Sequence, residues 1–337
     1  MWTTGIGGLR RRAGYGGLTP LLPVRARLLS LPPEAGLGLV VLFWGFNFAV
    51  VKVPLEVMPP FVVNAIRFAI SACVLGAIHV TASRAAGRSP LATFRVGVWP
   101  VVGLGVLGHA LYQVGFILGI ARTTAGGAAL LIALSPLVTA AAGHVLGVDR
   151  MARIGWIGAL VSLAGVVLVV LGRPGELGGD LTGVLLLLGA SVAWGLATAL
   201  SRPLLARGAT PVGLAFWGVM TALPVLTALA LTQLDDLRWA DVDRWDWLAL
   251  LYSGSLSTGV AYWIWNSSVQ KVGPSRTAAF SNLVPFVGVA AGAVLLGEPI
   301  VALQVLGGAL IVAGVVVVRR APSATAAPST APPLPRM

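Results

Sequence analysis

GALVSLAGVV at residues 158–167 and GGALIVAGVV at residues 307–316 are two copies of one apolar sequence, separated by 149 positions. Other residue types extend the similarity: Pro136 matches Pro285, Asp149 matches Glu298 and, at an offset of 150, Trp44 matches Trp194. Chance matches of Gly and Ala are easy in an apolar chain, but matched Pro, Trp and acidic positions at one nearly constant offset are not. The chain therefore contains an internal repeat.

The composition indicates a membrane protein. Of the 337 residues, 57% are hydrophobic and only 10% are charged, and the mean hydropathy is +0.91. A soluble domain carries roughly 25% charged residues. So few charges cannot cover a surface that faces water, so most of the outer surface is expected to face lipid.

The apolar residues are grouped in runs of a length that spans a bilayer. A spanning helix needs about 20 mostly apolar residues, because the hydrocarbon core is about 30 Å thick. Ten runs qualify: 36–56, 61–81, 95–118, 123–147, 154–172, 181–201, 211–232, 247–269, 276–297 and 300–318. The gaps between them are short, so no soluble domain is expected within the chain.

Each copy of the repeat contains five of these runs. Because five is odd, the second copy enters the membrane inverted relative to the first, and inverted repeats are typical of secondary transporters. We therefore expect an all-α integral membrane protein of ten transmembrane helices, arranged as two inverted five-helix repeats around a central cavity. The expected parts are a basic N-terminal tail (1–35), the two repeats (36–172 and 181–318) and a disordered Pro/Ala-rich tail (321–337).

The distribution of basic residues predicts the orientation. Of the 23 Lys and Arg residues, Lys52 and Arg67 lie inside runs, and four lie in the odd-numbered gaps: Arg122, Arg173, Arg238 and Arg244. The other 17 lie in the N-terminal tail, the even-numbered gaps and the C-terminal tail. Cytoplasmic loops are the ones enriched in Lys and Arg, so both termini are predicted to be cytoplasmic. The net charge of +12 follows from this pattern, and no nucleic-acid partner is expected.

Three segments carry a resemblance to a known family: FWGFNFAVVK (43–52), PPFVVNAIRFAI (59–70) and LLGEPIVALQVLGGALIVAGVVVV (295–318). They resemble the EamA-type branch of the drug/metabolite transporter superfamily, over about residues 36–319. The resemblance implies ten helices in two inverted halves, a central cavity, and transport of metabolites such as amino acids. The first repeat departs from the pattern, because LGVDRMARIGW (146–156) lacks the Glu-Pro pair of the second.

The predicted function is secondary transport. We expect small metabolites, such as amino acids or similar zwitterionic or anionic compounds, to be exported across the cytoplasmic membrane by alternating access. A drug exporter or a nucleotide-sugar-type transporter is the alternative within transport, and a membrane-embedded enzyme acting on lipids is the alternative outside it. The sequence contains no HExxH motif, aspartate-rich pair or soluble P-loop. No enzyme activity, cofactor or metal is therefore expected, and the partners are the lipid bilayer and a small-molecule substrate.

Two polar and aromatic stripes are the main candidates for substrate binding. At 100° per residue, each set shares one face of its helix. The first, in run 95–118, contains His109, Tyr112, Gln113 and Phe116. The second, in run 247–269, contains Ser255, Thr258, Tyr262, Trp265 and Asn266. The offset of 149 maps His109 onto Thr258 and Gln113 onto Tyr262, as expected for opposite walls of one cavity. The alternative is that these side chains only join helices by hydrogen bonds.

Arg67 is the most unusual charge, because it lies six residues inside a predicted helix. An Arg near the bilayer centre costs about 2.5–3.5 kcal/mol on insertion scales, so it is expected either to be paired or in water, or to reach the surface with its long side chain. Trp44 and Asn47 could share a cavity with Lys52, and Glu56 is a candidate counter-ion for either cation.

Pro136 and Pro285 are expected to kink their helices, because proline cannot donate a backbone hydrogen bond. A carbonyl freed in this way could line the cavity. Asn282, which lies close to Pro285, completes the set of candidate binding residues.

Energy coupling has two possible explanations in the sequence. Every acidic residue maps to a tail, a loop or a helix end, and His109 is the only group placed deep in a helix that titrates near neutral pH. Either transport is uncoupled, or His109 carries the proton. Thr258 at the matching repeat position favours uncoupled transport, because a hydroxyl there suggests a hydrogen bond to substrate.

Overall fold

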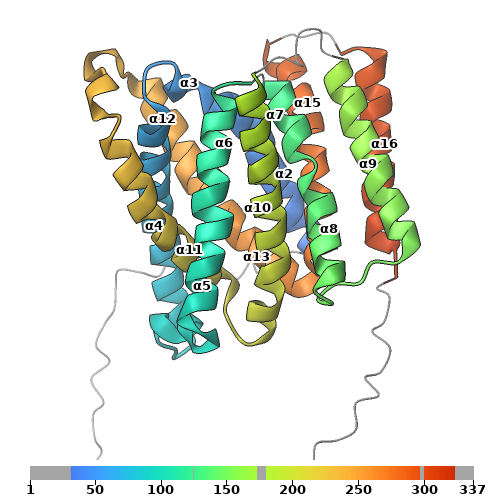
Figure 1. Ribbon diagram of the computed structural model, residues 1–337, viewed down its shortest axis with the longest axis horizontal. Coiled ribbons are helices and arrows are strands. Elements are labelled where there is room, and N and C mark those ends of the chain that lie inside the picture. Colours follow the sequence, from blue (N-terminus) through green and yellow to red (C-terminus); the bar gives the residue numbers. More distant parts are fainter. Residues whose placement is uncertain (1–31, 124, 173–179, 297–299, 323–337) are drawn as a thin grey trace, which may run out of the picture.

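The computed structural model describes residues 32–123, 125–172, 180–296 and 300–322, and within these ranges the chain is almost entirely helical, without β-strands (Figure 1). Eight helices in this part of the chain are long and apolar enough to cross a membrane: Pro33–Leu55, Pro60–Ala85, Val98–Ile120, Gly127–Val145, Arg153–Leu171, Leu181–Ala206, Pro211–Leu231 and Ala302–Arg320. The expected all-α membrane class is therefore confirmed. Most of both expected tails and Glu298 lie outside the described residues.

The helices of the first half are α2 (Pro33–Val50), α3 (Lys52–Leu55), α4 (Pro60–Ala85), α5 (Val98–Gly105), α6 (Tyr112–Ile120), α7 (Ala125–Ile132), α8 (Ser135–Val145) and α9 (Arg153–Leu171). Those of the second half are α10 (Leu181–Ala206), α11 (Pro211–Leu231), α12 (Arg244–Tyr252), α13 (Ala261–Val272), α14 (Pro274–Ala279), α15 (Val284–Leu296) and α16 (Ala302–Arg320). Short 3₁₀ turns lie at 90–96, 234–236 and 239–241.

Two expected runs are not among the eight membrane-crossing helices. The segment expected at 247–269 begins with α12 and ends with α13, and the segment expected at 276–297 is divided into α14, a 3₁₀ turn η6 (Phe280–Leu283) and α15. Side chains satisfy the free N–H groups at the start of α12, where the carboxylate of Asp243 accepts from the backbone N–H of Asp246 at 3.2 Å. The Asp246 carboxylate accepts from the backbone of Asp243 in return, which fixes the first turn of the helix.

Wide π-helical turns interrupt two helices at matching positions of the repeat. Between α5 and α6 lies η2 (Val106–Leu111), and between α12 and α13 lies η5 (Ser253–Val260). Both end at positions related by the 149-residue offset. A π turn holds more residues than an α turn, so it rotates the side chains that follow it, and such turns are frequent at functional sites.

The two prolines mark breaks at matching positions. In the first half, α7 ends at Ile132 and the chain becomes helical again as α8, with Pro136 in its first turn. In the second half η6 precedes α15, with Pro285 in its first turn. Each proline leaves the carbonyl four residues earlier, that of Ile132 or Ser281, without its usual helical donor.

α9 and α16 form an antiparallel pair along one side of the molecule (Figure 1). Gly158 lies against Gly314, and Gly165 lies against Gly307, so closely that a Cβ at any of the four would meet backbone atoms of the other helix. Glycine is required here because it lets two helix backbones come this near. We call this contact the glycine seam.

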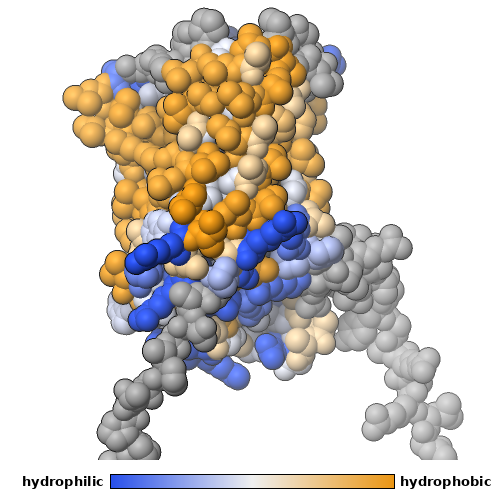
Figure 2. All heavy atoms as spheres, turned by 90° about the vertical axis from the view of Figure 1, so that its right-hand side faces the viewer, coloured by the Kyte–Doolittle hydropathy of each residue, from blue (hydrophilic) through white to orange (hydrophobic). Residues whose placement is uncertain are grey.

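Hydrophilic side chains gather at one end of the molecule, and apolar ones cover the wall above it (Figure 2). The start of α2 and the end of α16 lie together at that end, where Arg319 pairs with Glu34 at 2.8 Å. The two ends of the described chain therefore emerge on the same side, which we call the terminal side.

Candidate functional site

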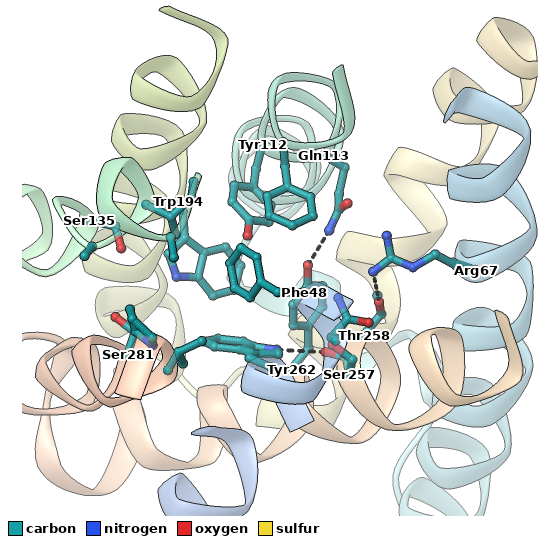
Figure 3. Close-up of a pocket in the computed structure, with 18 residues that line it drawn as sticks. Phe48, Arg67, Tyr112, Gln113, Ser135, Trp194, Ser257, Thr258, Tyr262 and Ser281 are labelled. Carbon is teal, nitrogen blue, oxygen red and sulfur yellow. Dashed lines mark hydrogen bonds between the residues drawn. The ribbon is translucent and has the colours of Figure 1, made fainter. Parts of the chain in front are cut away.

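A cavity lies between the two halves, and both contribute to its lining. It contains about 640 Å³ of empty space, counted to its open mouth. Its wall is formed by α2, α4, α6, α7, α8, α10, η5, α13, η6 and α15, and includes Trp44, Arg67, Trp194 and Tyr262. Figure 3 shows Arg67 near one end of this central cavity, Ser135 and Ser281 near the other, and aromatic rings between them.

Among the residues that the structure describes, Arg67 is the only charged side chain on the wall of the central cavity, and only 2% of it is exposed. One of its terminal nitrogens donates to Asn64 at 3.1 Å and the other to Thr258 at 3.4 Å. Within the described residues it forms no salt bridge, and its Nε has no hydrogen-bond partner. The side chain therefore turns inward and does not reach the surface, and Glu56, which is exposed, is not its counter-ion.

Aromatic rings form the middle of the wall. The rings of Trp44 and Trp194, which occupy matching repeat positions, meet edge to face with centroids 5.6 Å apart. The ring centroids of Tyr112 and Trp194 lie 5.0 Å apart, and Trp265, which is not on this wall, packs against Trp44 with ring centroids 4.9 Å apart. Aromatic side chains bind apolar groups because they bury a large apolar surface, and they bind cations through the electron-rich faces of their rings.

Some matching repeat positions contact each other directly. The amide of Gln113 donates to the hydroxyl of Tyr262 at 2.9 Å, and these two residues are related by the 149-residue offset. Trp44 and Trp194 do the same through their rings. Equivalent residues can contact each other only at the interface between the two copies. The centre of the cavity therefore lies at this interface.

The cavity brings together most of the predicted binding residues. Those on its wall are Trp44, Asn47, Arg67, Tyr112, Gln113, Phe116, Thr258, Tyr262 and Pro285. Ile132 and Ser281, whose carbonyls lose their usual donors to the two prolines, also line it. Asn47 is held by the hydroxyl of Ser253, which donates to its side chain at 2.5 Å.

The remaining predicted residues lie elsewhere. His109, Trp265 and Asn266 line a second, smaller cavity on the other side of Trp194 and Tyr262. Ser255 is half-exposed and donates to the carbonyl of Leu251, and Asn282 is buried, donating to Ser162 of α9. Pro136 is buried in the first turn of α8, outside both cavities. The expectation of a single stripe was therefore wrong for His109, because it assumed regular α-helix where the π turn η2 rotates the chain.

Half of the lining residues were not among the candidates from the sequence, and they include Phe48, Ser135, Trp194 and Ser257. The repeat could have supplied Trp194, because it matches Trp44. The backbone carbonyl of Ser257 accepts a hydrogen bond from the indole N–H of Trp44 at 2.9 Å. A backbone contact of this kind cannot be predicted from a sequence pattern.

A helical membrane protein with a polar and aromatic cavity between its two halves belongs to the class of membrane transporters. The model of the EamA-like transporter family matches residues 35–171 and again 181–320. The chain belongs to this family, within the drug/metabolite transporter superfamily, as the sequence resemblance predicted, and it is a multi-pass membrane transporter of small metabolites.

Several named relatives are similar along most of the chain. A probable amino-acid metabolite efflux pump of Salmonella typhimurium is 29% identical over 82% of this chain and 91% of its own length. A probable terminal-alkyne amino-acid exporter of Streptantibioticus cattleyicolor is 27% identical over 84% of this chain and 92% of its own. One solved crystal structure shares the fold, with a TM-score of 0.70 at 22% identity, over 85% of this chain and 95% of that one.

Proposed function

We propose that this protein exports amino acids across the cytoplasmic membrane, and that Arg67 binds their carboxylate. The observation that carries the proposal is a buried guanidinium on the cavity wall without an acidic partner among the described residues. A buried charge is stable only when it is compensated, and a planar guanidinium matches a carboxylate with two parallel hydrogen bonds. A carboxylate substrate supplies the missing charge.

The rest of the cavity suits the other parts of an amino acid. An ammonium group can lie against the faces of Trp44, Trp194 or Tyr262, or donate to the backbone carbonyl of Ser281, which lacks its usual helical donor. Apolar contacts from Phe48 and Ile132 can enclose a side chain. The efflux pump and the exporter named above are relatives whose names specify amino-acid compounds.

The alternative substrates fit this wall less well. A cationic drug would be repelled by Arg67, and a nucleotide sugar carries two phosphates but would find one cationic side chain on the wall. An enzyme acting on lipids would need a clustered nucleophile, base or metal, whereas the polar groups of the cavity are amides, hydroxyls and one guanidinium.

The architecture that supports alternating access is ten transmembrane segments in two inverted halves, residues 36–172 and 181–318. The eight membrane-crossing helices and the two interrupted segments together supply ten. Support for the inversion comes from the glycine seam, where Gly158 meets Gly314 and Gly165 meets Gly307. Such reciprocal contact between antiparallel copies is the pattern of a two-fold axis perpendicular to the helices.

Transport of amino acids is tested by counterflow in liposomes that contain the purified protein. We expect labelled amino acids to exchange against unlabelled ones in a saturable manner. The corresponding amino-acid amides are expected to exchange at least about tenfold less well, because they lack the carboxylate. The amides are matched in size, so they control for cavity volume. Equal exchange of acids and amides, or exchange of neither, would contradict the proposal.

Both termini are proposed to be cytoplasmic, because 17 of the 23 Lys and Arg residues lie on that side of the predicted topology. A fluorescent reporter that folds only in the cytoplasm is expected to be bright when fused after Arg320. Alkaline phosphatase fused at the same position is expected to be inactive, since it folds only outside. An active phosphatase and a dark fluorescent fusion would reverse the assignment.

We propose uncoupled exchange down the substrate gradient, because the acidic residues that the structure describes lie outside the central cavity. The same counterflow assay with and without a pH gradient tests this. Accumulation against the substrate gradient, driven by pH and lost in His109→Gln, would instead support His109 as the proton carrier.

A further inference from the structure

A second cavity lies on the terminal side of Trp194 and Tyr262, and we call it the inner chamber. It comprises about 350 Å³ of space between atoms, open solvent at its mouth included, and its polar lining residues include His109, Thr198, Ser201 and Asn266. Trp194 and Tyr262 line the central cavity as well as the inner chamber. These two aromatic side chains therefore form a partition between the central cavity and the inner chamber.

The inner chamber is the repeat counterpart of the central cavity. At offsets of 149 or 150 most of its lining residues match residues that line the central cavity: His109 matches Thr258, Trp194 matches Trp44, and Trp265 matches Phe116. His109 and Thr258 also lie in the two matching π turns. The same part of each half therefore builds one compartment on each side of the partition.

Polar groups in the inner chamber lack partners. Both ring nitrogens of His109 are buried without a hydrogen bond, and the side chain is 7% exposed. Asn266 lines the same space and is 8% exposed. A buried polar group without a partner costs about 1–3 kcal/mol. The unpartnered imidazole of His109 faces a small space that Asn266 also lines, which indicates that a polar ligand occupies this space during part of the protein's cycle.

We propose that the inner chamber is a second binding site for the transported amino acid, occupied when the cavity is open toward the terminal side. This inference rests on the proposed function. A neutral imidazole can accept a hydrogen bond from the ammonium group, and the Asn266 amide can donate to the carboxylate. No charged side chain lines the inner chamber among the described residues, so this site holds the carboxylate without a cation. His109 is then a binding residue that replaces charge by hydrogen bonding.

Cysteine accessibility tests the site in the full-length protein. The single native cysteine, Cys73, is exposed and is first replaced by serine. Asn266→Cys in this background is treated with a membrane-impermeant methanethiosulfonate on vesicles of either orientation. We expect labelling only from the terminal side. An equimolar mixture of proteinogenic amino acids, at ten times its half-saturating concentration in counterflow, is expected to slow it about tenfold, whereas a mixture of amino-acid amides slows it less.

The control for access is Arg88→Cys, an exposed position after α4, whose labelling should not respond to amino acids. With His109→Leu added, the concentration that halves labelling of Asn266→Cys is expected to rise about five- to tenfold, and His109→Gln should recover most of this loss, because glutamine restores a donor and an acceptor.

The inference is overturned if Asn266→Cys is not labelled from either side, if amino acids do not protect it, or if protection is the same in His109→Leu. Each of these results is compatible with counterflow by the unsubstituted protein, and so leaves the proposed function standing. Absence of counterflow with every amino acid would overturn the proposed function and this inference together.

Discussion

Replacing Arg67 by leucine is expected to lower the efficiency of amino-acid counterflow about 30- to 150-fold, while the purified protein resists heat at least as well as before. The guanidinium is the only charge that the described residues place on the cavity wall, so its removal takes away the carboxylate's main partner. A hydrogen bond to a charged group contributes about 2–3 kcal/mol, and each 1.4 kcal/mol is a factor of ten.

The expected effect on stability has the opposite sign from that of a structural arginine. Breaking a buried ion pair destabilises a protein, because the remaining partner is left charged in a medium of low dielectric constant. Arg67 leaves no such partner behind, since it forms no salt bridge with any described residue. Removing an uncompensated buried cation relieves its desolvation cost, and the loss of the bonds to Asn64 and Thr258 offsets only part of this gain.

Two controls separate substrate binding from folding. Arg67→Lys keeps the charge but loses the planar fork, and we expect about a tenfold reduction in efficiency. Amino-acid amides should exchange equally poorly in the unsubstituted protein and in Arg67→Leu, because neither can form the carboxylate contact. A large loss of thermal stability in Arg67→Leu, or equal losses for acids and amides, would assign Arg67 a structural role.

Adding a single methyl group to the glycine seam is expected to destabilise the protein by about 1–3 kcal/mol. In Gly307→Ala the new Cβ would meet the carbonyl oxygen of Gly165 and the backbone nitrogen of Val169. Backbone atoms in packed helices cannot rotate away as a flexible side chain can, so α9 and α16 must separate along their length. The measurement is the fraction that remains monodisperse after heating in detergent.

The matched control uses the same substitution where there is room. A Cβ at Gly38 in α2 or Gly189 in α10 would have no neighbour within 4 Å. Alanine there is expected to be neutral or to stabilise by up to about 1 kcal/mol, because it favours the helix over glycine. If Gly307→Ala and Gly189→Ala melted alike, close helix contact would not be the reason for glycine at the seam.

The sequence predicted those features that depend on composition and periodicity. The apolar runs identified a helical membrane protein, and quoted motifs such as FWGFNFAVVK identified the family. The inward position of Arg67 was left open, because a side chain of that length can reach the surface or a cavity from the same helical position. Only the packing of α4 against α11 and η5 decides between them.

The division into a central cavity and an inner chamber could not be predicted from the sequence. Periodicity analysis assumes 3.6 residues per turn, and it placed His109 with Tyr112 and Gln113 on one face. The π turns change that count at the positions that matter, and their residues, such as Gly108 and Ser257, are small and common in membrane helices. The breaks near Pro136 and Pro285 were easier to anticipate, since their cause is a single residue type.

The glycine seam also bears on how such a chain could arise. A position in the first copy meets a second position in the other copy, and the reverse contact is also made. Such reciprocal contacts are those of a symmetric dimer of identical chains, so α9 and α16 pack as the antiparallel helices of a homodimer would. In a dimer encoded by one short gene, every substitution would appear twice. Once the two copies are joined, each can change alone, so Arg67 in the first copy does not require a second buried cation at the matching place of the second.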